Sequence, residues 1–159
     1  MKTLLLYAAE QYSFVKDSRT QLLSYCKTVK DVDFLKENTS FGRGGSMRNL
    51  MVHIANVYEY WIAEIALDRK INYTSYEACK TVEEVERLFD SIDKYVEALI
   101  QKLEDPSTTR VYLINNEKKE TSLFKIFSHV ISHEFHHKGQ ILSISRLLGY
   151  TPVDTDMIR

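Results

Sequence analysis

Four of the five histidines in this chain are concentrated between positions 129 and 137, in the segment SHVISHEFHHKGQ. His133 and His137 are one helical turn apart, so on a helix their imidazole rings share a face and can reach one metal ion at about 2.0–2.1 Å. The fifth histidine, His53, lies in a distant segment that is also rich in apolar residues. Imidazoles at this spacing point to metal-ion chemistry.

A helical projection places His133 and His137 in the middle of an apolar stripe. With an advance of about 100° per residue, the same stripe contains Ile126, Val130, Ile144 and Leu148. Imidazoles buried without partners cost about 1–3 kcal/mol each, and one shared ion would satisfy them. We therefore predict one divalent transition-metal ion on His53, His133 and His137. Zinc or nickel would suit three neutral nitrogens with a coordination position left open.

Other interpretations of the histidines stay open. They could be core residues that hydrogen-bond to carbonyl groups or to side chains such as Asn49 and Tyr60. His129 and His136 project to the flank of the stripe, which makes them weaker ligand candidates. Gln140 projects toward the interior and could hydrogen-bond the outer ring nitrogen of a ligand histidine or a water.

Residues 133–137 also match the HExxH pattern, in which two histidines bind zinc and the glutamate is the general base of a protease. Proteases of that kind usually take a third ligand further along the chain, and neither His nor Glu follows His137 here. This reading is therefore disfavoured. Glu134 projects about 100° from His133, at the margin of the ligand face, where it either approaches a bound water or is a solvated surface charge.

Four long helices are predicted to position these residues. Their apolar spacing and end signals place them at residues 3–28, 46–67, 81–103 and 122–148. The end signals are Ser46 as an N-cap, a capping box at Thr81 and Glu84, a stop at Asp105, Pro106 and Ser107, and Gly149 as a C-terminal cap. The glycine-rich stretch KENTSFGRGGS separates the first two helices, and residues 109–122 read as a small hairpin or a loop.

This pattern predicts an all-α protein with one domain over residues 1–159, a four-helix bundle with at least one crossover connection. A chain of 159 residues can bury a sizeable core without a metal or a disulfide. Cys26 and Cys79 form no CxxC pair and are expected to be free, part-buried thiols.

Charge and hydropathy exclude several classes of partner. The 21 Lys and Arg against 22 Asp and Glu give a formal net charge of −1 without long single-sign blocks, so nucleic acid is not an expected partner. No window approaches the roughly 18 apolar residues of a membrane span. The apolar run in MKTLLLYAAEQ is too short for a signal peptide, so we expect a cytoplasmic protein.

The segment SHVISHEFHHKGQILSISRLLG resembles the last helix of the DinB and YfiT-like superfamily, which carries a similar NHxxHHxGQ sequence. The segment SMRNLMVHIANVYEYW is similar to the family's stretch in which one histidine precedes aromatic residues. The resemblance covers nearly the whole chain. It implies a four-helix bundle, usually a dimer, with a triple-histidine metal site that would fall on His53, His133 and His137.

The resemblance also implies a reaction class. Relatives with known activities include thiol S-transferases and a maleylpyruvate isomerase that use low-molecular-weight thiols. A metal-dependent transferase that activates such a thiol for attack on an electrophile is the first expectation, because an open metal position lowers the pKa of a bound thiol. The alternatives are a non-enzymatic, stress-associated protein stabilised by its metal, and a metal-free helical interaction module.

The last helix is predicted to be apolar on a second face as well. Phe124, Ile131, Phe135 and Leu142 project opposite the histidine stripe. Residues 107–120 could cover them, but a homodimer interface is the favoured use, because exposed aromatic patches usually mark contacts.

Overall fold

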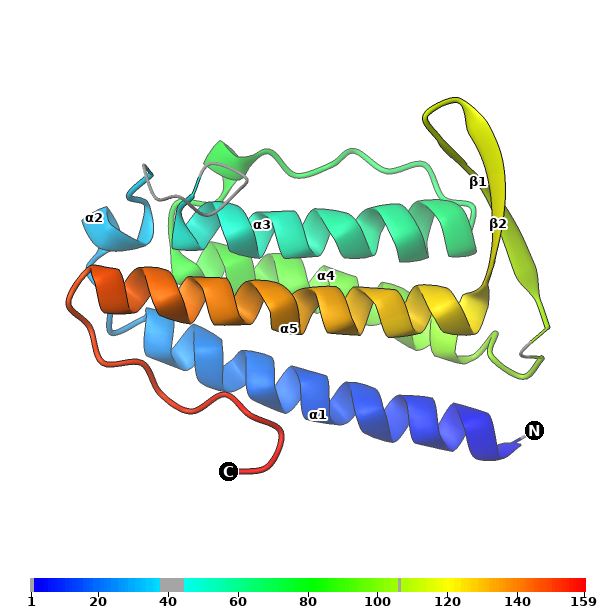
Figure 1. Cartoon of the computed structure of the whole chain (residues 1–159), viewed down its shortest axis with the longest axis horizontal. Helices are drawn as coiled ribbons and strands as arrows, with labels where there is room; N and C mark the ends of the chain where they lie inside the picture. The colour runs from blue at the N-terminus through cyan, green and yellow to red at the C-terminus, as the bar shows by residue number, and fades with distance from the viewer. Residues whose placement is uncertain (1, 38–44, 106) are drawn as a thin grey trace.

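The computed structural model describes residues 2–37, 45–105 and 107–159, which are mostly helical (Figure 1). The elements in chain order are α1 (Lys2–Cys26), α2 (Asp31–Phe34), α3 (Met47–Tyr58), η1 (Glu59–Ala66), η2 (Tyr76–Ala78), α4 (Val82–Ile100), β1 (Thr109–Ile114), β2 (Glu117–Ser122) and α5 (Leu123–Leu147). Most of the glycine-rich break, residues 38–44, and the predicted stop at Pro106 lie outside the described residues.

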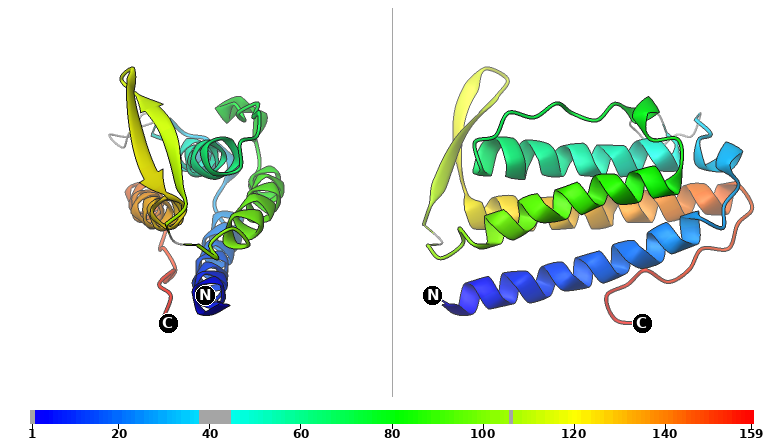
Figure 2. Two further views of the ribbon diagram at one scale, coloured as in Figure 1. Left: turned by 90° about the vertical axis from the view of Figure 1, so that its right-hand side faces the viewer. Right: turned by 180° about the vertical axis from the view of Figure 1, so that it is seen from behind.

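The long helices lie side by side around a shared apolar core. Viewed end-on, α5, α3, α4 and α1 follow one another around that core, so α3 and α5 are neighbours (Figure 2). Each helix contributes a buried stripe, including Tyr12, Leu50, Ile92 and Phe127. An all-α class is thereby supported, with a small hairpin added. None of the helices among the described residues is both long and apolar enough to cross a membrane.

The predicted helix boundaries agree with the structure to within a few residues. The Ser46 side chain accepts a hydrogen bond from the Asn49 backbone at 2.9 Å, and Thr81 with Glu84 forms the expected capping box. Gly149 adopts a φ of 89°, which a glycine accommodates readily just after α5. The helix predicted over 46–67 is continuous, but its second half, η1, is a π-helix, which hydrophobic spacing cannot reveal.

Residues 109–122 form an antiparallel hairpin in which Thr109 pairs with Ser122 and Ile114 with Glu117. The turn residues Asn115 and Asn116 have φ values of 52° and 61°, a conformation that asparagine tolerates and that two-residue hairpin turns require. The hairpin projects from the start of α5 (Figure 2). Of the two alternatives predicted for residues 109–122, the hairpin is confirmed and the loop is wrong.

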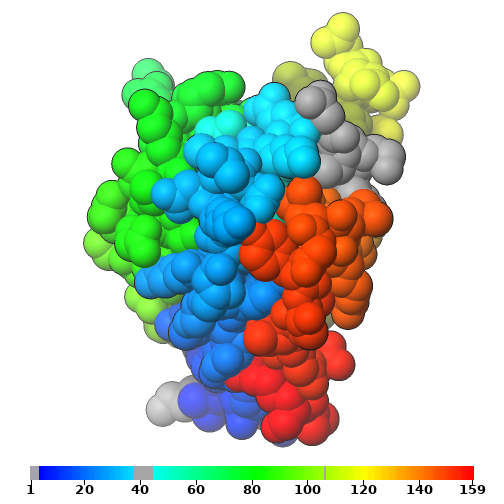
Figure 3. Space-filling model, turned by 90° about the vertical axis from the view of Figure 1, so that its left-hand side faces the viewer, coloured from blue at the N-terminus to red at the C-terminus, as the bar shows by residue number. Residues whose placement is uncertain are grey.

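The C-terminal residues after α5 run back along α1, where the space-filling view shows them against its surface (Figure 3). The buried Ser18 hydroxyl donates to the Thr155 carbonyl at 2.5 Å, and Arg159 forms an ion pair with Asp17. These contacts fasten the tail to α1.

Candidate metal centre

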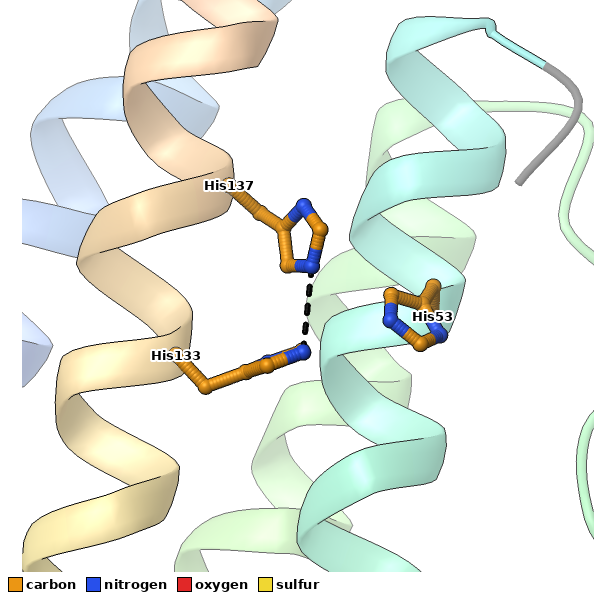
Figure 4. Close-up of side chains that lie close together, drawn as sticks. All are labelled: His53, His133 and His137. Carbon is orange, nitrogen blue, oxygen red and sulfur yellow. Dashed lines mark hydrogen bonds between the residues drawn. The ribbon is translucent and has the colours of Figure 1, made fainter. Parts of the chain in front are cut away.

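Three histidine side chains from two neighbouring helices converge on one point. His133 and His137 extend from α5 toward His53 on α3 (Figure 4). One ring nitrogen of each lies within 4.8 Å of the others, and the Nε2 atoms of His133 and His137 are 3.0 Å apart. Two nitrogens that share an ion at 2.0–2.1 Å with an angle between 90° and 109° would be about 2.8–3.4 Å apart. The observed separation suits a shared ion.

Gln140 fixes the orientation of one of these rings. Its Oε1 lies 2.6 Å from Nδ1 of His137. Because a carbonyl oxygen can only accept, Nδ1 carries the proton and Nε2 keeps its lone pair directed at the centre. The hydrogen bond predicted between Gln140 and the outer ring nitrogen of a candidate ligand is present, although Gln140 itself is only half-buried.

The environment of His133 keeps its imidazole in the neutral form that binds metals. Burial, with further contributions from His137 and His53, lowers the pKa of His133 from 6.5 to about 3. Nδ1 of His133 is buried and has no hydrogen-bond partner within the described part of the chain. A neutral, partly desolvated imidazole of this kind is suited to bind a divalent transition metal.

The other two histidines lie outside this cluster. The His129 ring contacts Trp61, with ring centroids 5.4 Å apart, and lies 5.9 Å from the His133 ring. His136 is exposed and its Nε2 faces the Gln140 amide nitrogen at 3.3 Å. Their placement at the flank of the ligand face agrees with the helical projection.

Asn49 and Tyr60, the suggested partners for core histidines, bond elsewhere. Asn49 donates to the Glu37 carboxylate at 3.1 Å, and the Tyr60 hydroxyl donates to the Leu113 carbonyl at 3.5 Å. These bonds join Asn49 to Glu37, before α3, and Tyr60 to Leu113 on β1.

Glu134 is neither a solvated charge nor directed at the centre, so both predicted alternatives for it are wrong. Its side chain is fully buried. Arg19 from α1 donates to both carboxylate oxygens at 3.0 and 2.9 Å, the Tyr58 hydroxyl donates at 2.6 Å, and Lys138 lies 3.3 Å away. With all its acceptor positions engaged by these donors, Glu134 cannot serve as the general base of an HExxH site.

The buried carboxylate and its cationic partners stabilise one another in their charged forms. Burial alone would raise the pKa of Glu134, but Arg19 and Lys138 hold it below its ordinary value. Burial lowers the pKa of Lys138 to about 8, although Glu134 opposes that shift. Arg19 also donates to Asp93 on α4 at 2.7 Å. One carboxylate thus connects α1, α3 and α5, and its guanidinium partner extends the connection to α4.

This cluster was missed at the sequence level, although a signal existed. Buried residues of α1 recur at positions 12, 15, 19, 22 and 26, so Arg19 stands where a core residue is expected. The buried face of α5 is centred on Glu134, and His133 lies at its edge, not in the middle as predicted. That edge position accounts for the partial exposure of His133, and His53 on α3 is likewise only half-buried.

The second apolar face of α5 is only partly exposed. Ile131 is buried, Phe135 and Leu142 are half-buried and pack against the core, and Phe124 is 42% exposed. The Lys138 ammonium lies 4.1 Å from the centre of the Phe135 ring.

Comparison with known protein families gives one result. The family model described as "DinB family" matches residues 1–159, the full length of the sequence. The chain belongs to the DinB family. The resemblance predicted from the last helix is thereby confirmed, and a search of curated proteins found no match. Within this DinB family member, the three converging histidines are those that the resemblance predicted as metal ligands.

Proposed function

We propose that this protein binds one divalent transition-metal ion, zinc or nickel, through His53, His133 and His137. The observation that carries the proposal is the convergence of three imidazole nitrogens within 4.8 Å, with His137 oriented by Gln140. Three nitrogen ligands leave at least one coordination position, as catalytic sites do. The partial exposure of His53 and His133 supports access to that position from outside.

We further propose that the centre serves a metal-dependent transferase that uses a low-molecular-weight thiol. A bound ion of this kind supplies positive charge that lowers the pKa of a thiol and so increases its nucleophilic form. The sulfur would form a bond to an electrophilic carbon, the thiol proton would pass to solvent, and the leaving group would depart with its electron pair.

The chain's own cysteines support an external thiol as the nucleophile. Cys26 and Cys79 are both buried. Burial raises the pKa of Cys26 to about 12 and also raises that of Cys79, so both are poor nucleophiles at neutral pH. A thiol reaction at the histidine centre therefore requires a thiol from outside the chain.

Elemental analysis of untagged protein tests the metal proposal. We expect near-stoichiometric metal in the parent and none in the variant His133→Ala with His137→Ala. The control is His136→Ala, which removes an exposed histidine of the same helix outside the cluster. A parent that contains no metal and takes up neither zinc nor nickel would overturn the proposal.

The transferase proposal needs a second assay, with metal-loaded protein, cysteine or another small thiol, and an aromatic halide. We expect halide release that depends on both metal and thiol and that disappears in the double histidine variant. Tightly bound metal without any thiol transfer would instead favour the non-enzymatic metal-binding protein stabilised by its ion.

We also propose that the chain forms a single-domain four-helix bundle and that the protein is a cytoplasmic homodimer. The exposed ring of Phe124 and the half-buried Phe135, which lie at the margin of the buried face of α5, support a second copy as the partner. Light scattering at micromolar concentration should give the mass of a dimer, and a monomer would contradict this part of the proposal.

A further inference from the structure

A ring-sized cavity of about 200 Å³ opens beside the histidine centre. Its lining consists of Trp61, Tyr112, Thr121, Lys125, Ile126 and His129. The histidine of this lining lies next to the centre, because its ring is 5.9 Å from that of His133. None of these six residues belongs to the converging histidine triad, so the cavity is a separate structural feature.

The walls of the cavity are aromatic rings from three different elements. The Trp61 ring on η1 packs edge to face against two other rings. Its centroid is 4.9 Å from that of Tyr112 on β1 and 5.4 Å from that of His129 on α5. An aromatic wall closed by Ile126 favours a planar, apolar ligand. A dry cavity of about 150 Å³ is enough to hold benzene, so the space here matches a single ring.

One residue of the cavity lining carries positive charge. Lys125 has an exposed side chain and is the one permanently charged residue of the six, while Thr121 adds a hydroxyl. A ligand with an anionic group at the edge of its ring would pair with this ammonium group. The ring itself would then lie over the aromatic walls.

The cavity and the centre follow one another along α5. Lys125, His129, His133 and His137 succeed each other at intervals of four residues, so they form one row on the helix surface. From Lys125 to His133 the row covers two turns, or about 12 Å. A ligand that pairs with Lys125 and rests against His129 therefore has its other end directed at the candidate metal ligands.

We propose that this cavity binds the ring of a single-ring aromatic substrate that carries a carboxylate, with Trp61 and Tyr112 against the ring and Lys125 on the carboxylate. Such a molecule would be the substrate of the proposed transferase, and this part of the inference rests on that proposed function. Binding itself depends only on the cavity residues.

Trp61 is the single tryptophan of the chain, so its indole N–H resonance and its fluorescence report on the cavity alone. We would titrate metal-free protein with benzoate and, separately, with benzyl alcohol, which has the same ring without the charge. Saturable shifts of the Trp61 resonance are expected with both, and tighter binding with benzoate. Because only one ring and one charge pair contribute to binding, we expect the shifts to saturate at millimolar concentrations of benzoate.

Two variants assign the contacts. Lys125→Met should weaken benzoate binding by roughly fivefold, the range of one solvent-exposed charge pair, and leave benzyl alcohol unchanged. Lys118→Met on the exposed strand β2 is the control and should bind both as the parent does. Tyr112→Ser should weaken both ligands, because it removes a wall from the cavity.

The inference is overturned if benzoate gives no saturable change at Trp61, or if Lys125→Met binds benzoate as the parent does. The variant His133→Ala with His137→Ala separates this result from the proposed metal site. Benzoate binding in that variant supports the cavity even where metal uptake fails. If the parent takes up metal but does not bind benzoate, the proposed role of the cavity is refuted and the proposed metal site is not.

Discussion

Glu134→Gln is the substitution that best separates a buried structural carboxylate from a catalytic base. The change keeps the size of the side chain and removes its charge. In the native protein Arg19 donates to both carboxylate oxygens, and Tyr58 and Lys138 add a third and a fourth contact. An amide has one acceptor oxygen and one NH₂ group, so in either orientation the NH₂ group faces two donors.

The expected cost is large because the partners stay buried. Arg19 and Lys138 are 4% and 2% exposed, so neither can regain water without moving. Breaking a buried ion pair by removing one partner costs about 3–5 kcal/mol. For a protein of this size about 1 kcal/mol corresponds to 2–4 °C, so the midpoint of thermal unfolding should fall by about 6–20 °C.

Urea and thermal unfolding of parent and variant, monitored by circular dichroism, measure this cost. Glu97→Gln is the matched control, because Glu97 forms an exposed ion pair with Lys16 at 3.8 Å and its loss should change stability little. Metal content of folded Glu134→Gln should equal that of the parent. A variant that is as stable as the parent but catalytically dead would refute this reasoning and restore Glu134 as a general base.

Three further outcomes follow from the centre and the cysteines. Gln140→Leu should lower metal affinity by about 10- to 100-fold in a competition titration, because the His137 ring loses the bond that orients it. In metal-free protein, urea unfolding should show stability falling as the pH drops from 6.5 toward 3, with a smaller fall in His133→Gln. The folded pKa of His133 is about 3, so the unfolded chain binds the extra proton throughout that window. A disulfide reagent should react with Cys26 and Cys79 only after denaturant is added, because both thiols are buried.

Each of these three outcomes has a control and a contrary result. Gln101→Leu, an exposed glutamine just after α4, controls for the loss of an amide, and equal affinities in both variants would contradict the role of Gln140. A pH dependence that is identical in parent and His133→Gln would show that His133 is not responsible. Rapid labelling of native protein would mean that at least one thiol is accessible.

The sequence alone determined the helical elements and their ends. Hydrophobic spacing is a local property, and caps such as Ser46 and the Thr81–Glu84 box depend only on residues within one turn. The hairpin could only be narrowed to two alternatives, because short β-prone runs need a partner to be stable. The π-helical geometry of η1 carried no sequence signal at all.

The histidine triad was predictable because its chemistry is rare and its spacing is regular. The spacing of His133 and His137 follows from the helical repeat, and His53 was the remaining histidine on an apolar helix. The sequence could not place His53 beside the other two, because the order in which helices pack is decided by contacts between distant segments. The structure brings α3 next to α5 and so completes the cluster.

Only the tertiary structure decided the environment of Glu134 and the cavity at Trp61. Which face of a helix is buried depends on the partners that neighbouring elements offer to its side chains. Glu134 can be buried because Arg19, which is 115 residues away in the sequence, pairs with its carboxylate. Trp61, Tyr112 and His129 likewise belong to three separate elements that meet only after folding. Residue types and local spacing therefore identified the candidate metal ligands, whereas the burial of a charge and the shape of the cavity at Trp61 depended on long-range packing.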